Sequence, residues 1–169
     1  MTDFILADPA RCIGCRTCEV ACASAHTTTP LTSSAFRPRL SVVKHGLVSV
    51  PVMCHQCENA PCAAACPTGA LVQGRTTVEI DEARCIGCNS CVVVCPFGAV
   101  TIQRQTNTEG LKVIKCDLCV ASENGPACIS VCPTAALSLT GAQALAQLSG
   151  QRRSDTAISA GVNESKPRA

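Results

Sequence analysis

Aromatic residues are nearly absent from this 169-residue sequence, which has three Phe and neither Trp nor Tyr. Aromatic side chains supply much of the buried area in ordinary cores, and they form the stacking surfaces on which single-stranded nucleic acid binds. The sequence also lacks a basic run, and its formal net charge of +2 is close to neutral. These absences argue against nucleic-acid binding and against a core built from aromatic packing.

Long apolar runs are absent as well, because no stretch approaches the roughly 18 residues that a membrane span needs. The first residues, Met1 to Asp8, contain neither a basic segment nor an extended apolar segment, so we expect no export signal. There is no G-x-G-x-x-G fingerprint, no Walker lysine loop and no nucleophile–base pair. We therefore expect a soluble cytoplasmic protein that is not itself an enzyme.

Cysteine, in contrast, is abundant, with 16 residues in the chain. At this density in a small chain, cross-links or metal ions often replace a large core. The cysteines fall into four groups of four with none left over. These are quartet 1 (Cys12, Cys15, Cys18, Cys22), quartet 2 (Cys54, Cys57, Cys62, Cys66), quartet 3 (Cys85, Cys88, Cys91, Cys95) and quartet 4 (Cys116, Cys119, Cys128, Cys132).

The spacing within the quartets indicates iron–sulfur clusters. Quartets 1 and 3 read C-x2-C-x2-C-x3-C, and a proline follows quartet 3, as in the run that holds cubane clusters in bacterial ferredoxins. Quartets 2 and 4 widen the middle gap to four and eight residues. Three quartets end alike, which marks an internal repeat. The repeats are Cys66-Pro67-Thr68-Gly69-Ala70-Leu71, Cys95-Pro96-Phe97-Gly98-Ala99-Val100 and Cys132-Pro133-Thr134-Ala135-Ala136-Leu137.

Two other uses of 16 cysteines are a secreted disulfide scaffold and a zinc-stabilised interaction module. The expected reducing compartment disfavours disulfides, and there such spacing favours metal. Structural zinc uses two C-x2-C pairs per ion and has no need of a regular third cysteine followed by x3-C-P. We therefore expect four 4Fe-4S clusters, with zinc as the alternative.

Other polar residues in the cysteine loops carry weaker signals. The chain has three histidines, His26, His45 and His55. His55 lies between Cys54 and Cys57 and could donate a hydrogen bond to a cluster, but we expect a solvated loop histidine. We expect Asn89 and Asp117 to be ordinary loop residues for the same reason.

Short strands, turns and one-turn helices recur along the chain, which predicts an α+β fold with a small hydrophobic core. From Arg152 to Ala169 the chain is polar and we expect it to be irregular. The predicted strands are 4–7, 40–43, 47–50, 71–72, 78–80, 100–102, 112–114 and 137–139, and the predicted helices span 19–26 and 140–151 and begin near Pro61 and Pro126.

Several longer motifs identify a family resemblance over about residues 1–150. They are similar to motifs of the four-cluster ferredoxin-like electron-transfer subunits found beside molybdenum or tungsten formate dehydrogenases. The formate hydrogenlyase small iron–sulfur subunit is the nearest type, and the subunits of dimethyl sulfoxide reductase-like enzymes and carbon monoxide dehydrogenases are more distant. The motifs are Arg11-Cys12-Ile13-Gly14-Cys15-Arg16-Thr17-Cys18, Cys54-His55-Gln56-Cys57, Lys115-Cys116-Asp117-Leu118-Cys119 and Gly125-Pro126-Ala127-Cys128.

The resemblance implies tandem bacterial-ferredoxin-like modules in residues 1–140. From composition we expect a C-terminal helix and mobile tail in residues 141–169. The resemblance pairs quartets 1 and 4 in an outer module and quartets 2 and 3 in an inner module. It also implies four ligand sets. These are site a (Cys12, Cys15, Cys18, Cys132), site b (Cys116, Cys119, Cys128, Cys22), site c (Cys54, Cys57, Cys62, Cys95) and site d (Cys85, Cys88, Cys91, Cys66).

The same resemblance implies a function. A chain of this type relays single electrons between a molybdopterin formate dehydrogenase, or a related catalytic subunit, and a hydrogenase or other acceptor. Two alternatives stay open: an accessory protein that delivers clusters to a maturing formate dehydrogenase, and an electron-transfer partner of carbon monoxide dehydrogenase. Neither alternative requires nucleic acid or a membrane span.

Overall fold

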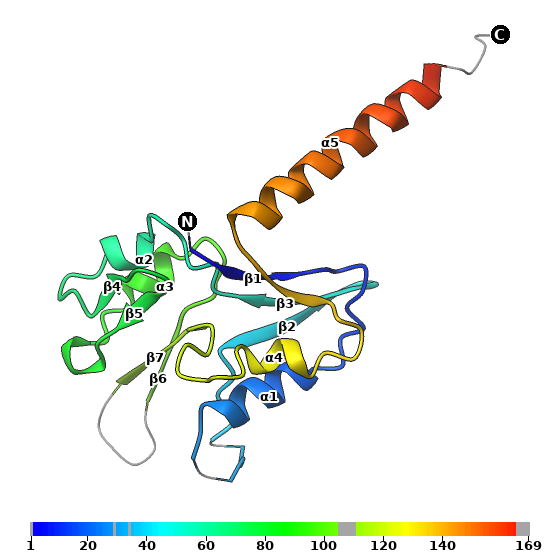
Figure 1. Ribbon diagram of the computed structural model, residues 1–169. Coiled ribbons are helices and arrows are strands. Elements are labelled where there is room, and N and C mark those ends of the chain that lie inside the picture. The colour runs from blue at the N-terminus through cyan, green and yellow to red at the C-terminus, as the bar shows by residue number, and fades with distance from the viewer. Residues whose placement is uncertain (1, 29, 34, 105–110, 165–169) are drawn as a thin grey trace.

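The computed structural model describes residues 2–28, 30–33, 35–104 and 111–164. Short helices and four two-stranded antiparallel sheets make up this part of the chain, together with one long C-terminal helix (Figure 1). The predicted α+β class is therefore confirmed. The strands are β1 (Phe4–Ala7), β2 (Leu40–His45), β3 (Val48–Met53), β4 (Leu71–Gln73), β5 (Val78–Ile80), β6 (Thr101–Arg104), β7 (Leu111–Ile114) and β8 (Leu137–Thr140).

Apart from the C-terminal helix, the helices are short because each one carries only part of a cysteine loop. Pro61 occupies the first turn of its helix, where a proline ring fits without loss of a hydrogen bond. The predicted helix starts near Pro61 and Pro126 are confirmed. The helices are α1 (Thr17–Ala25), α2 (Pro61–Ala64), α3 (Ser90–Val94), α4 (Ala127–Ser130) and α5 (Ala142–Glu164), with a 3-10 turn at Glu82–Arg84.

Three of the four sheets are hairpins of neighbouring strands: β2 with β3, β4 with β5 and β6 with β7. The fourth sheet joins the two ends of the folded body, since β1 pairs with β8 in the register Phe4 to Thr140 and Ala7 to Leu137. Both strands were predicted, but nothing in their sequences indicates this pairing. From the sequence we also expect a turn at 106–110, between the strands at 100–102 and 112–114, and these residues lie outside the described ranges.

Two separate groups of buried residues form the core. The first contains Ile5, Val42 and Leu137 and belongs to β1, β2, β3, β8, α1 and α4, which we call the outer half. The second contains Leu71 and Val100 and belongs to α2, α3 and β4 to β7, the inner half. Cysteine side chains are members of both groups, so the metal-ligand candidates occupy places that a larger protein would fill with aliphatic side chains.

The C-terminal helix α5 extends away from this body (Figure 1). The expectation of an irregular chain from Arg152 is wrong for residues 152–164, which continue the helix. The reason is that Ala, Gln, Arg and Ser tolerate helix and no proline interrupts the sequence before Pro167. No helix in the described ranges is long and apolar enough to cross a membrane.

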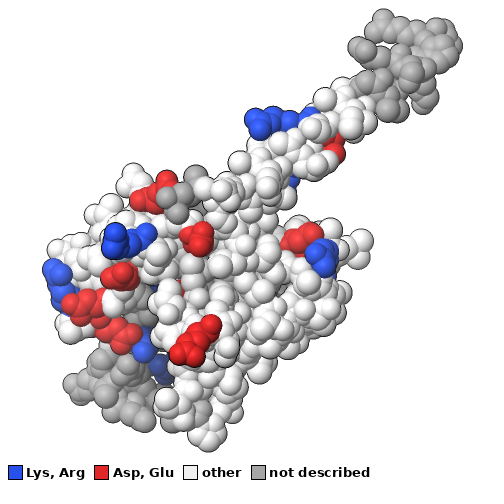
Figure 2. Space-filling model, in the orientation of Figure 1, with Lys and Arg blue, Asp and Glu red and all other residues white. Residues whose placement is uncertain are grey.

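Charged side chains are distributed unevenly on the face shown in Figure 2. Acidic and basic residues intermingle over the inner half around β4 and β5, whereas the part over β1 to β3 carries few charges. The two halves therefore present different surfaces to solvent on this side of the molecule.

Candidate metal centres

Three cavities are each lined by four cysteines, and in each case the cysteines come from two quartets. Every cavity combines the first three cysteines of one quartet with the last cysteine of another. The cavities contain Cys12, Cys15, Cys18 and Cys132 of site a, Cys54, Cys57, Cys62 and Cys95 of site c, and Cys85, Cys88, Cys91 and Cys66 of site d.

The four cysteines of site b also lie close together, where α1 packs against α4. Burial, together with the neighbouring thiols of Cys116, Cys22 and Cys119, raises the pKa of the Cys128 thiol to about 12. The structure thus brings together all four cysteine sets that the resemblance implies.

The loops of quartets 1 and 3 have the same backbone conformation. Gly14 and Gly87 both have φ of 70°, and the residues before each helix, Arg16 and Asn89, are left-handed with φ of 61° and 63°. A side chain at Gly87 would also force the Leu111 side chain to move. These turns fold each loop back on itself, so that three cysteines face one cavity.

The repeat that ends three quartets supplies a backbone hydrogen bond to sulfur. The amide of Ala70 donates to Cys66 Sγ at 3.2 Å, and Ala99 and Ala136 donate in the same way to Cys95 at 3.4 Å and Cys132 at 3.3 Å. Each fourth cysteine is therefore held by the amide four residues later. Amide donors to sulfur stabilise negative charge on a cluster and so tune its potential.

Quartet 1 lacks this repeat and replaces the donor. No proline follows Cys22, and α1 continues past it to Ala25. The amide of Arg39, from the connection before β2, donates to Cys22 Sγ at 3.3 Å instead. A contact distant in sequence thus reproduces what the other three quartets obtain locally.

The thiols differ in how readily they would ionise. The Thr17 hydroxyl, 3.3 Å from Cys15 Sγ, lowers the pKa of Cys15, and Ser90 lowers the pKa of Cys88 similarly. Burial acts to raise the pKa of Cys66, but hydrogen bonds from the loop outweigh it and lower the value to about 7. Burial raises the pKa of Cys18 to about 11. Because metals bind the thiolate, loading the buried positions would release protons.

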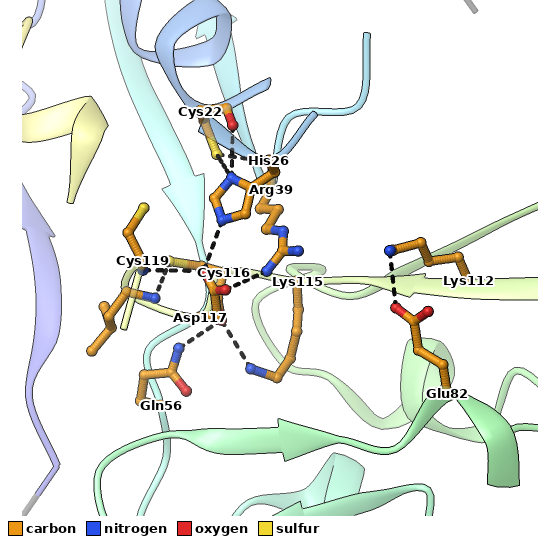
Figure 3. Close-up of polar contacts among 11 residues, drawn as sticks. Cys22, His26, Arg39, Gln56, Glu82, Lys112, Lys115, Cys116, Asp117 and Cys119 are labelled. Carbon is orange, nitrogen blue, oxygen red and sulfur yellow. Dashed lines mark hydrogen bonds and ion pairs between the residues drawn. The ribbon is translucent and has the colours of Figure 1, made fainter. Parts of the chain in front are cut away.

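A charged network adjoins site b. His26 Nδ1 lies 2.7 Å from the Cys22 carbonyl, and its Nε2 lies 3.1 Å from Asp117, which also pairs with Arg39 at 2.6 Å (Figure 3). Asp117, with help from Cys119 and Cys22, raises the pKa of His26 to about 12. Burial acts to raise the pKa of Asp117, but His26 and Arg39 outweigh it and hold the pKa below its usual range.

Two expectations for the loop residues are therefore wrong. Asp117 is not an ordinary loop residue, because it connects His26 and Arg39. His55 is not a solvated loop histidine either. Its ring stacks between Phe4 and Phe97, with centroid distances of 5.3 Å and 4.0 Å, and burial lowers its pKa. Asn89 does behave as an exposed loop residue, donating to the Gly87 carbonyl at 3.1 Å.

Sequence reasoning missed three buried polar residues. Glu19 accepts a hydrogen bond from the Val42 amide at 2.6 Å and so ties α1 to β2. Gln56 and Lys115 both donate to the Cys116 carbonyl, at 2.7 Å and 2.9 Å (Figure 3). The sequence did offer a hint for Lys115, because this lysine directly follows the apolar residues of β7. Glu19 looks like an ordinary helix residue and Gln56 like an ordinary loop residue.

The donor chemistry of all four sites fits an iron–sulfur cluster. Sets of four soft thiolates select zinc or iron–sulfur clusters over hard cations such as Mg²⁺. The remaining group of possible ligands in the described ranges, His26, Asp117 and Cys119, is already joined by the ion pairs described above.

Comparison with known proteins distinguishes between these metals. Two sequence families, both described as a 4Fe-4S dicluster domain, match residues 46–142 and 11–70. The chain is 43% identical to the electron transport protein HydN of Escherichia coli K12, over 94% of this chain and 99% of that protein. It is 37% identical to formate hydrogenlyase subunit 2 of the same strain, with coverage of 90% and 89%. It is 45% identical to the putative oxidoreductase UacF, over 99% of this chain but 26% of that protein.

Proposed function

The chain belongs to the 4Fe-4S dicluster family, and from that premise we propose that it is an electron-transfer subunit that relays single electrons through four clusters. The family matches and the 16 cysteines show that it binds multiple 4Fe-4S clusters. Such clusters accept and release one electron at a time. Relatives that are named electron transport proteins support a non-catalytic carrier.

Sites a to d are the proposed ligand sets. Three coincide with the four-cysteine cavities, and the mutual influence of the thiols supports the fourth. In each site, the chain would supply four thiolates and at least one amide donor to sulfur. The proposed domain boundaries are 1–140 for the two modules and 141–169 for the C-terminal segment.

The interlocking of the quartets is the observation that carries this proposal. Cys18 of site a and Cys22 of site b lie four residues apart on α1, so the sites are separated by about one helical turn. Cys62 and Cys66 join sites c and d in the same way around α2.

Sites b and c are linked by Cys116 and Cys54, which belong to the same buried group, and the Cys54 thiol contributes to raising the pKa of Cys116. The four sites therefore form a continuous series from a to d. An uninterrupted series of sites is the arrangement that electron relay through the protein requires.

The ends of this series are the proposed points of electron entry and exit. Cys15 in site a and Cys88 in site d are exposed, whereas the site b and site c cysteines are intermediate or buried. The exposed apolar side chains of Ile13 and Ile86 lie two residues before these two cysteines in the same loops. A partner that docks at either end can approach a cluster without opening the fold.

The identity of the relatives supports specific partners. We assign a molybdopterin formate dehydrogenase, or a related catalytic subunit, to one end and a hydrogenase or another acceptor to the other. The similarity to formate hydrogenlyase subunit 2 supports this assignment. We also assign the protein to the cytoplasm.

Anaerobic analysis of iron, acid-labile sulfide and zinc in the purified chain tests the cluster count. We expect about 16 irons and 16 sulfides per chain, the sum for four cubanes. A formate dehydrogenase supplied with formate should then bleach the visible absorbance of the clusters. Zinc without sulfide would overturn the proposal, and ready loss of a cluster to an apo-acceptor would favour the delivery role instead.

A further inference from the structure

Lys115 is a buried cation between β7 and quartet 4, with 1% of its surface exposed. Its ammonium donates to the Cys116 carbonyl at 2.9 Å (Figure 3). Within the described ranges of the chain, the ion pairs involve other residues and no carboxylate pairs with Lys115. A charge that is buried with only neutral partners is costly, so an anion close by is expected to compensate it.

The hydrogen bond by itself does not explain the burial of this lysine. Gln56 is fully buried, and its amide nitrogen already donates to the same Cys116 carbonyl at 2.7 Å. The Gln56 side chain is itself held in place, because its oxygen accepts from the Val78 amide at 2.9 Å. The carbonyl is therefore satisfied without Lys115, and the contribution specific to Lys115 is its positive charge.

The Lys115 ammonium lies close to the loop of site c, because it shares the Cys116 carbonyl with Gln56, which stands between Cys54 and Cys57 in the sequence. Burial raises the pKa values of Cys54 and Cys62, and the Lys115 ammonium opposes this rise at both thiols. In site b the strongest charged neighbours of Cys116 and Cys128 are other thiols, such as Cys22. The buried cation thus lies between the loops of sites b and c, in the middle of the series.

We propose that Lys115 is the residue that raises the reduction potential of the cluster in site c relative to the same cluster without this cation. A cubane with four thiolates is anionic, and the electron it accepts from a donor adds one more negative charge. A fixed cation stabilises that reduced form, more strongly in a buried site than in water. The transferred electron then occupies the cluster of site c more often than it would without Lys115. This inference rests on the proposed clusters.

The test compares two lysines of the same region in the full-length holoprotein. Lys115→Met removes the charge, retains an unbranched apolar side chain and leaves Gln56 on the Cys116 carbonyl. Lys112→Gln is the matched control, because Lys112 lies on β7 but is partly exposed and pairs with Glu82 at 3.2 Å (Figure 3). Both variants change the net charge of the chain by one.

Anaerobic potentiometric titration followed by electron paramagnetic resonance gives the potentials, and the signal altered in Cys95→Ser identifies site c. We expect Lys115→Met to reduce the equilibrium constant for reduction of that cluster at least tenfold, equal to about 59 mV for one electron. We expect Lys112→Gln to change it less than twofold, since the Glu82 pair is solvent-screened. Lys115→Arg, which keeps the charge, should retain the wild-type potential.

Each outcome bears on a different claim. Unchanged potentials in Lys115→Met, with all clusters present, would overturn the role of Lys115 and leave the electron-transfer function intact. If Lys115→Met does not retain the cluster, the Lys115→Arg variant decides between the outcomes. A wild-type potential in Lys115→Arg supports the role of the positive charge, and a tenfold lower equilibrium constant for reduction overturns it. A wild-type chain without iron and sulfide would instead overturn the proposed function itself.

Discussion

The two halves of the molecule build the same kind of four-cysteine site by different routes. In the inner half, β4 pairs with β5 and β6 with β7, so its hairpins are formed from neighbouring residues. In the outer half, β1 pairs with β8, and α1 packs against α4 from the other end of the chain. One motif can therefore be completed either by local hairpins or by the two ends of a domain.

The helices that carry the third cysteine show the same contrast. In the inner half, Val92 follows Cys91 and packs against the apolar group around Leu71. In the outer half, Glu19 follows Cys18, and its buried carboxylate accepts from the Val42 amide. At the residue after the third cysteine, the outer half thus uses a polar contact to a distant segment, whereas the inner half uses apolar packing.

Loss of the fourth cysteine of a quartet should have the largest effect, and this effect should be confined to one half of the molecule. We expect Cys132→Ala to remove about four irons and to expose the β1 and β8 amides, while β4 to β7 stay protected. Cys95→Ala should do the reverse. Iron analysis and native-state hydrogen exchange measure both results. Equal loss of protection throughout the chain in either variant would mean that the halves are one cooperative unit.

Core truncation should have the next largest effect. Leu137 and Leu71 are 3% and 2% exposed in the two buried groups, so replacing either with Ala should lower the free energy of unfolding by about 2–5 kcal/mol. Anaerobic denaturant unfolding of the holoprotein measures the change. Leu139→Ala, at an exposed position on the same strand as Leu137, is the control and should stay within about 0.5 kcal/mol. A large effect of Leu139→Ala would show that β8 is covered in solution.

The charged network at site b should give the outer half a pH dependence. His26 has a folded pKa of about 12, above its unfolded value of about 6.5, so its stabilising effect is complete below pH 6.5 and is lost as the pH rises toward 12. Relative to His26→Gln, the free energy of unfolding of the wild type should fall by at most about 1.4 kcal/mol per pH unit above pH 6.5. Unfolding curves from pH 6 to pH 9 measure this slope. A free-energy difference between the wild type and His26→Gln that does not change with pH would contradict the assigned ion pair.

Backbone strain in one repeat should give the smallest effect. Ala135 is left-handed with φ of 48° where the other two repeats have Gly69 and Gly98. Ala135→Gly should raise stability by up to about 1 kcal/mol, because it removes a left-handed alanine at some cost in chain entropy. Gly98→Ala, where no atom lies within 4 Å of the added Cβ, should lower it by a similar amount. The apparent melting temperature of the holoprotein reports both changes. A shift of the same sign in both variants would contradict backbone strain at Ala135.

Much of the fold could be predicted because its signals are local. Proline at helix starts, glycine in cysteine loops and alternating apolar residues indicate elements within a few residues, and β1, α1 and the hairpins follow from them. The pairing of β1 with β8 could not be predicted, because the residues of the two strands would suit many partners. The α5 prediction ended too early because polar composition alone does not distinguish an exposed helix from an irregular segment.

The candidate site was predictable for the cysteines and not for the residues that surround them. Spacing specifies which cysteines share a loop, but Arg39 and Gln56 reach a sulfur and a carbonyl of other loops. Such contacts depend on tertiary packing. His55 illustrates the same limit, since its two phenylalanine partners, Phe4 and Phe97, come from segments on either side of it in the chain.

The pairing of β1 with β8 also has a consequence for the order in which the protein is made. At a synthesis rate of 5–20 residues per second, the ribosome needs roughly 6–24 s to proceed from Cys12 to Cys132. With the proposed ligand sets, sites c and d have all their cysteines once Cys95 has emerged, whereas site a waits for Cys132, just before the last strand. Clusters would then be inserted from the site d end of the series toward site a, and a nascent chain would expose the unpaired thiols of Cys12, Cys15 and Cys18 to oxygen for longest.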